Sequence, residues 1–116
     1  MTFLRTLNIA FLIIIVVYTI IAISNDGPDL VTPFISNIIA MNWSGQFNID
    51  FMMYLILSAV WVAWRHDFSG GGLVLAAIAS VGGILFLGVY LIVQIGRSEG
   101  DVERLVLGDR RAAARR

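Results

Sequence analysis

Several residue types are missing or scarce in this chain, and each absence excludes a class of chemistry. There is no cysteine, so disulfides, thiolate nucleophiles and iron–sulfur or cysteine-based zinc sites are excluded. There is no lysine and only one histidine, so a protein zinc site with several ligands is not expected. Eight arginines balance eight acidic residues, and this zero net charge gives no reason to expect a nucleic-acid partner. We therefore expect no metal, no cofactor and no nucleic acid, and an enzyme is the least favoured class of function.

Long uncharged apolar runs dominate what is present. They cover residues 8–24, 51–64 and 68–96. Apolar residues make up 59% of the chain, and the mean hydropathy is +0.86. In soluble domains about 45–50% apolar residues are usual. A helix of about 20 apolar residues crosses the roughly 30 Å hydrocarbon layer of a bilayer. The chain is therefore expected to lie in a membrane.

We predict an all-α integral membrane protein with three transmembrane helices, at about residues 4–23, 49–64 and 73–95. They form one transmembrane domain over residues 1–96, followed by an arginine-rich C-terminal tail at 97–116 that is either a surface helix or a solvated end. The lipid bilayer is the first expected partner, and the expected location is the inner (plasma) membrane, crossed several times. The first apolar run also resembles a secretory signal, but its 17 residues exceed the usual apolar core of about 7–15, so we expect it to be retained.

A short amphipathic helix is predicted after the first span, at about residues 30–40. Its apolar residues recur at helical spacing on one face: Leu30, Val31, Phe34, Ile35, Ile38 and Ile39. This segment is too short to cross the bilayer, so it is expected to lie at the interface.

Small residues form a stripe along the third span. They are Gly72, Ala76, Ala79, Ser80 and Gly83, and Ala59 and Ala63 offer a similar face on the second span. Small side chains let two membrane helices approach closely. A tight connection at residues 65–72 predicts that the second and third spans form an antiparallel hairpin. The stripes then serve either the packing of this hairpin or contact with a second copy or a larger membrane protein.

Asp50 marks a candidate polar layer. Only 14 uncharged residues separate it from Arg65, about 21 Å of helix, so one of the two charges lies within the apolar slab. Arginine can extend to the interface along its long stem, and aspartate cannot. In an antiparallel hairpin the same level holds Tyr18, Tyr54, Tyr90, Gln94 and Arg97. Three interpretations stay open: an aspartate favoured by the helix dipole among interfacial tyrosines, a site for a small ligand or a proton, and an interface with another protein.

The opposite end of the second span carries Trp61, Trp64, Arg65 and His66, which we interpret as interfacial anchors. A lone membrane histidine also ligates tetrapyrroles in pigment proteins, and this is the alternative for His66. Membrane orientation stays open. With three spans, two arginines lie on the N-terminal side of the membrane and six on the side of the C-terminal tail, and this count favours a cytoplasmic tail. Arg5 before the first span, with Asp26 and Asp29 after it, favours a cytoplasmic N-terminus instead.

Two segments carry a resemblance to a known family. Residues 47–51 lead into an apolar span that ends with Val60-Trp61-Val62-Ala63-Trp64, and Gly82-Gly83 and Leu91 follow in the third span. Residues 29–97 thus resemble a family of short bacterial inner-membrane proteins classed as a domain of unknown function, with Asp50 and Trp61 as the matched positions. The resemblance implies a three-span helical fold with an aspartate opening the second span, and no activity.

For function we favour a small structural or accessory membrane protein that packs through its small-residue helix faces against a second copy or a larger partner. A chain of this size has little room to enclose a substrate pathway alone. The alternative is an oligomeric binder or carrier of a small ligand, lipid or pigment, around Asp50.

Overall fold

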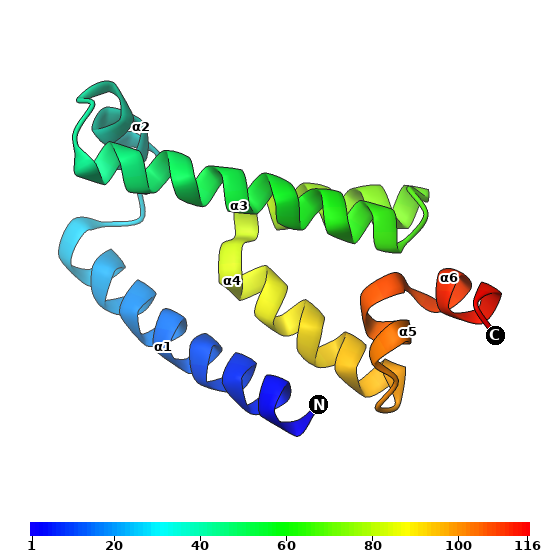
Figure 1. Ribbon diagram of the computed structural model, residues 1–116. Coiled ribbons are helices and arrows are strands. Elements are labelled where there is room, and N and C mark those ends of the chain that lie inside the picture. The colour runs from blue at the N-terminus through cyan, green and yellow to red at the C-terminus, as the bar shows by residue number, and fades with distance from the viewer.

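The computed structural model describes all 116 residues, of which 84% are helical, and it contains no strand. Six helices follow one another along the chain (Figure 1): α1 (Thr2–Asp26), α2 (Val31–Ile39), α3 (Trp43–Arg65), α4 (Gly70–Ser98), α5 (Val102–Leu107) and α6 (Asp109–Ala114). Three of them, α1, α3 and α4, are long and apolar enough to span a membrane. The predicted all-α membrane fold, with three such helices and a short amphipathic one, is confirmed.

Polar side chains set the starts of the helices. The Asn42 carboxamide oxygen accepts a hydrogen bond from the Gly45 N–H at 2.9 Å, and the Ser69 hydroxyl accepts one from the Gly72 N–H at 3.1 Å. Because Asn42 caps α3, this helix begins at Trp43, six residues before the predicted start. The sequence places the start later because Asn48 is a plausible N-cap, whereas the Asn48 side chain donates to the Phe34 carbonyl and the helix continues through the polar residues before it.

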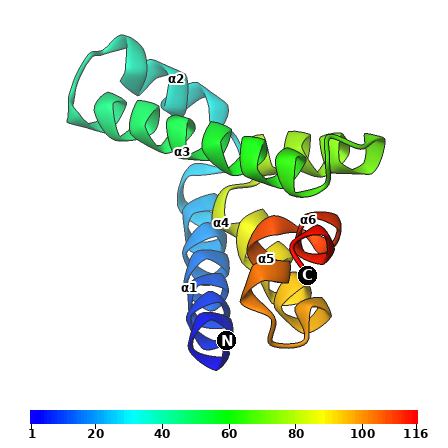
Figure 2. The ribbon, with the colours of Figure 1, turned by 45° about the vertical axis from the view of Figure 1, so that its right-hand side comes forward.

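The short helix α2 lies against the first turns of α3 (Figures 1 and 2). Asp29 accepts a hydrogen bond from the Thr32 N–H at 3.1 Å and so caps its start. The Asn48 side chain donates to the Phe34 carbonyl at 3.1 Å and ties the two helices together. Gly45 is buried where they meet, and a Cβ there would overlap the backbone of Asn37. This contact fixes α2 across the end of α3.

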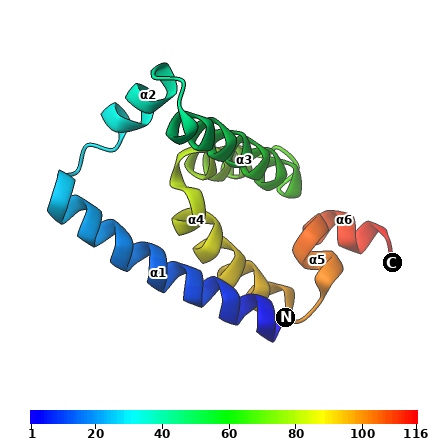
Figure 3. The same cartoon turned by 60° about the vertical axis from the view of Figure 1, so that its left-hand side comes forward.

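The helix α4 is broken at Gly83, where φ is 57° and ψ is −145°. Only glycine adopts this conformation readily, because it has no Cβ. The first half of α4 runs antiparallel to α3 and reaches the level of Phe51, whose ring lies 3.1 Å from where a Gly83 Cβ would stand. The second half then turns back toward the C-terminal end of α3 and diverges from α3 as it runs beside α1, as the views in Figures 1 and 3 show. The predicted hairpin is therefore correct for the first half of α4 and wrong for the second half.

The core is small and lies where the two halves of α4 meet the C-terminal half of α3. Its buried members are Val62, Ala79 and Tyr90, with Ala59, Trp61, Leu75, Phe86 and Leu87 packed around them. The second half of α4 also packs against α1, where Gly88 leaves room for Leu12, whose side chain would lie only 3.0 Å from a Cβ at Gly88. Only 15 of the 116 residues are buried, so most of the apolar surface faces outward. Such a surface suits contact with a lipid bilayer.

The small-residue stripes predicted on α3 and α4 lie within this α3–α4 contact. Gly72 packs against His66, and Ala79 and Ala63 are buried. The remaining members, Ala59, Ala76, Ser80 and Gly83, are half-buried. Packing of the chain on itself, the first of the two interpretations offered by the sequence, therefore uses part of both stripes, and contact with a second copy or a larger membrane protein stays a prediction.

Candidate functional site

The predicted polar layer does not assemble. Tyr90 is buried beside Arg65 and His66, at the opposite end of α3 from Asp50. The break at Gly83 is the reason, because it turns the second half of α4 back toward that end. Two members follow Tyr90 along α4: Gln94, which is buried, and Arg97, which is exposed. Two members of the predicted layer are largely exposed: Tyr54, one turn after Asp50 on α3, and Tyr18 on α1. The layer expected from a straight third span is therefore corrected to two separate groups.

The first group is a polar stripe on α3 formed by Gln46, Asp50 and Tyr54, hereafter the α3 stripe. These residues lie four apart, so they share one face of the helix. All three are exposed, and none has a side-chain hydrogen bond or ion pair within the chain, in contrast to Asn42 and Asn48 nearby. Sequence reasoning missed Gln46, although its spacing of four residues from Asp50 was a sufficient signal.

The depth of Asp50 makes this exposure costly. Seven residues separate it from the start of α3 at Trp43, a rise of about 10 Å on a helix about 35 Å long. If α3 crosses a bilayer with a core of roughly 30 Å, the carboxylate lies below the headgroups. A charged group at that depth costs up to about 3 kcal/mol even on insertion scales, and such groups normally face protein or water. The chain itself supplies Asp50 with neither an arginine nor a hydroxyl.

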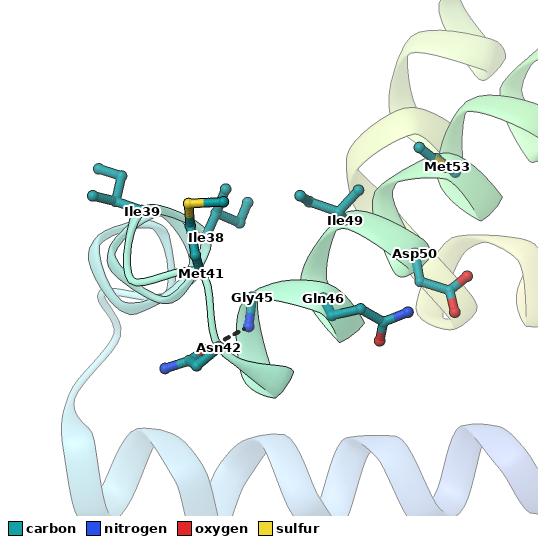
Figure 4. Close-up of a pocket in the computed structure, with 9 residues that line it drawn as sticks. All are labelled: Ile38, Ile39, Met41, Asn42, Gly45, Gln46, Ile49, Asp50 and Met53. Carbon is teal, nitrogen blue, oxygen red and sulfur yellow. Dashed lines mark hydrogen bonds between the residues drawn. The ribbon is translucent and has the colours of Figure 1, made fainter.

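An open groove of about 720 Å³ adjoins the α3 stripe between α2 and α3 (Figure 4). Its lining residues are Ile38, Ile39, Met41, Asn42, Gly45, Gln46, Ile49, Asp50 and Met53. Figure 4 shows the side chains of Gln46 and Asp50 extending away from Ile38 and Ile39 of α2. The groove is thus apolar toward α2 and polar along one edge, an arrangement suited to an amphipathic occupant.

The second group is a hydrogen-bonded cluster around Tyr90. Its hydroxyl lies 3.2 Å from Arg65 Nη1 and 2.7 Å from His66 Nε2. Because arginine only donates, the tyrosine oxygen accepts from Arg65 and its proton is free for a neutral His66. The Tyr90 ring stacks on Phe86 and meets Trp61 edge-on. The His66 Nε2 is therefore engaged within the protein, which disfavours the tetrapyrrole alternative.

Arg65 is buried without a carboxylate partner. Its Nε donates to the Leu105 carbonyl at 2.6 Å and its Nη2 to the Arg104 carbonyl at 3.1 Å. Trp61 Nε1 donates to the Val106 carbonyl at 3.2 Å. These carbonyls belong to the last turn of α5, where a cation is favoured and most backbone acceptors lack helical donors; the Arg104 carbonyl also accepts from the Gly108 N–H at 3.1 Å. Arg65 and Trp61 therefore cap α5.

The tail caps α3 in return. Arg111 of α6 donates to the Trp64 carbonyl, and its guanidinium lies 4.1 Å from the centre of the Trp64 ring. It also pairs with Asp67 at 3.2 Å. Three of the residues predicted as interfacial anchors, Trp61, Trp64 and Arg65, thus hold the C-terminal tail on the end of α3, and the fourth, His66, contacts Tyr90 of α4. Nothing in the tail's composition indicated which residues would receive it.

We expect acid to weaken this cluster. Burial lowers the pKa of His66 below its ordinary 6.5, and the positive charges of Arg65 and Arg97 add to that effect. His66 therefore binds a proton more readily in the unfolded chain than in the folded one. The stability that neutral His66 contributes to the folded state is fully present above about pH 6.5 and is lost as pH falls through the lowered pKa. The measurement is the thermal unfolding midpoint in detergent across this range. A His66→Gln variant should lose part of the pH dependence, and an unchanged profile would contradict the assignment.

No three His, Asp or Glu side chains lie close enough together to hold a metal ion. No family model, no curated protein and no solved structure matches the chain. The features of the chain that bear on function are therefore the α3 stripe, the adjoining groove and the cluster around Tyr90.

Proposed function

We propose that this chain is a small structural or accessory membrane protein that binds its partner through the α3 stripe. The observation that supports this is the exposed carboxylate of Asp50, which has no partner in its own chain and lies below the headgroups if α3 crosses a bilayer. A second membrane protein, or a second copy, that supplies a donor would remove most of the cost of that charge.

The surface proposed for this contact differs from the one that the sequence favoured. The small-residue faces of α3 and α4 pack partly against each other, with Gly72, Ala79 and Ala63 buried, so they leave less surface for a partner than the α3 stripe does. The free face of α3 carries Gln46, Asp50 and Tyr54, all of which form interhelical hydrogen bonds readily in membranes. We further propose that the protein belongs to the inner membrane of a bacterium, as the family resemblance implies.

A cross-linking experiment tests this proposal. A photoreactive residue at Met53, beside the α3 stripe, should capture one discrete protein in the membrane, whereas one at Val81, on the exposed face of α4, should capture only lipid. Adding Asp50→Leu should reduce the Met53 product at least about tenfold, since losing a charge contact costs more than about 1.4 kcal/mol. The matched control is Ile56→Leu, a conservative change at another exposed position of α3. Lipid capture alone at Met53 would contradict the proposal.

The groove between α2 and α3 supports a second candidate, a binder or carrier of a small amphipathic ligand such as a lipid or pigment. Its volume of about 720 Å³ lies within the range of small-molecule sites, about 300–1,000 Å³. Mass spectrometry of the protein extracted in mild detergent separates the two candidates. A stoichiometric small molecule that is lost in Asp50→Leu supports the carrier, and a co-purifying protein lost in the same variant supports the accessory role.

A further inference from the structure

All eight arginines of the chain lie toward one end of the molecule. Arg5 is in the first turn of α1, Arg65 ends α3, and the other six lie in residues 97–116. Figure 1 shows the N-terminus, the α3–α4 connection and the tail toward the right, with α2 at the far left. Figure 3 shows the N-terminus beside the end of α4 as well. Regions that are far apart in the sequence therefore share one end of the fold.

The break in α4 produces this arrangement. At its start, Gly72 packs against His66; at Gly83 the helix faces Phe51; and at Tyr90 it has returned to His66. A groove of about 730 Å³ in the angle of α4 is lined by both Leu75 and Arg97. In a straight helix these two residues would be about 33 Å apart. The helix thus enters and leaves at the same end of α3.

The other end of the molecule carries only negative charge. It holds Asp26, Asp29 and Asp50, and no arginine or histidine. The arginine-bearing end holds five acidic residues beside its eight arginines, a net charge of +3. All basic residues of the chain therefore lie at one end, and the charged residues of the other end are all acidic.

We infer that the arginine-bearing end is the surface that meets the cytoplasmic leaflet, so that both termini lie in the cytoplasm and α4 enters the membrane from that side and returns to it. Arginine accumulates on the cytoplasmic side of membrane proteins, and the anionic lipids of that leaflet attract it. Broken helices at membrane depth are tolerated where protein covers them, and Phe51 and Leu55 of α3 cover the break at Gly83. A straight α4 would instead separate the tail from the N-terminus and divide the arginines between the two sides.

This inference does not depend on the proposed function. In the inferred orientation, the α3 stripe lies in the non-cytoplasmic half of the bilayer, because Asp50 lies toward the end of α3 that contacts α2.

The absence of cysteine makes a direct test possible, using single-cysteine variants of the full chain in intact bacterial cells. Asn25→Cys and Ser44→Cys report on the acidic end, and Thr2→Cys, Gly70→Cys and Ala113→Cys report on the arginine-bearing end; all five positions are exposed. A membrane-impermeant maleimide should label the first two in intact cells and the other three only after permeabilisation. Matched expression of each variant, checked by labelling after detergent solubilisation, is the control.

Two results would overturn the inference. Labelling of Ala113→Cys together with Asn25→Cys, while Gly70→Cys stays protected, would mean that α4 crosses the membrane once. Labelling of Thr2→Cys, Gly70→Cys and Ala113→Cys in intact cells, with Asn25→Cys protected, would mean that the opposite end faces the cytoplasm.

Discussion

A Gly83→Leu variant is expected to straighten α4. At φ 57° and ψ −145°, a residue with a Cβ costs about 1–3 kcal/mol, and leucine is favoured over glycine in a continuous helix by up to about 1 kcal/mol. The Phe51 ring also lies 3.1 Å from the position of the new Cβ. The shift of roughly 2–4 kcal/mol favours an unbroken α4. Spin labels at Ser69→Cys and Gly96→Cys, close to the same end in the folded-back helix, should then move to about 40 Å apart.

The matched control is Gly71→Leu, in the same helix. A side chain there meets no atom within 4 Å, and its φ is ordinary, so the distance between the two labels should not change. If Gly83→Leu folds and leaves that distance as it was, the glycine does not determine the break. A circular dichroism spectrum of the variant distinguishes this result from loss of the fold.

Replacing Arg65 by leucine is expected to release the C-terminal tail. The substitution removes three hydrogen bonds, to the Arg104 and Leu105 carbonyls and to the Tyr90 hydroxyl. The buried Leu105 carbonyl loses its donor, whereas the Arg104 carbonyl still accepts from the Gly108 N–H and the Tyr90 hydroxyl still contacts His66. Hydrogen bonds from a charged donor contribute about 1.5–3 kcal/mol each, so we expect a loss of at least about 3 kcal/mol in the docking of α5 and α6. Trypsin should then cut after Arg104 and Arg110 on the order of a hundred times faster in the membrane-embedded protein.

Arg97→Leu serves as the control, because it removes an exposed arginine beside the same cluster that makes no hydrogen bond there. Tryptic cleavage at Arg104 should remain slow in this variant. A second variant, Gly108→Ala, tests the same contact from the tail, since Gly108 has a φ of +87° and its Cβ would overlap the Arg65 carbonyl. If trypsin cleaves after Arg104 equally slowly in Arg65→Leu, Arg97→Leu and Gly108→Ala, the tail is held by other contacts.

The sequence predicted the elements of this fold well and their arrangement only in part. The spans at about 4–23, 49–64 and 73–95 all lie within helices, because an apolar run long enough to cross lipid is a property of consecutive residues. The helix over 30–40 was predicted from its spacing and is present as α2. The α3–α4 hairpin followed from the short connection and the small residues, and its first half is present.

The candidate site was predicted less well. Asp50 was identified from its distance along the chain to Arg65, and Tyr54 belongs to the same exposed stripe. Tyr90 and Gln94 were placed at the wrong end, because the prediction assumed that α4 is straight. The pair Gly82-Gly83 was visible in the sequence, but glycine is common in unbroken membrane helices and does not by itself indicate a break.

By itself, the sequence determined that this protein is helical and apolar enough for a membrane, since hydrophobicity and capping act between neighbouring residues. Only the tertiary structure decided that α4 turns back at Gly83, that Arg65 caps α5, and that every arginine shares one end. Those outcomes depend on contacts between residues far apart in the chain, such as Gly83 with Phe51 and Arg65 with Leu105. Patterns of neighbouring residues do not predict these contacts, because each contact forms only when the helices pack together.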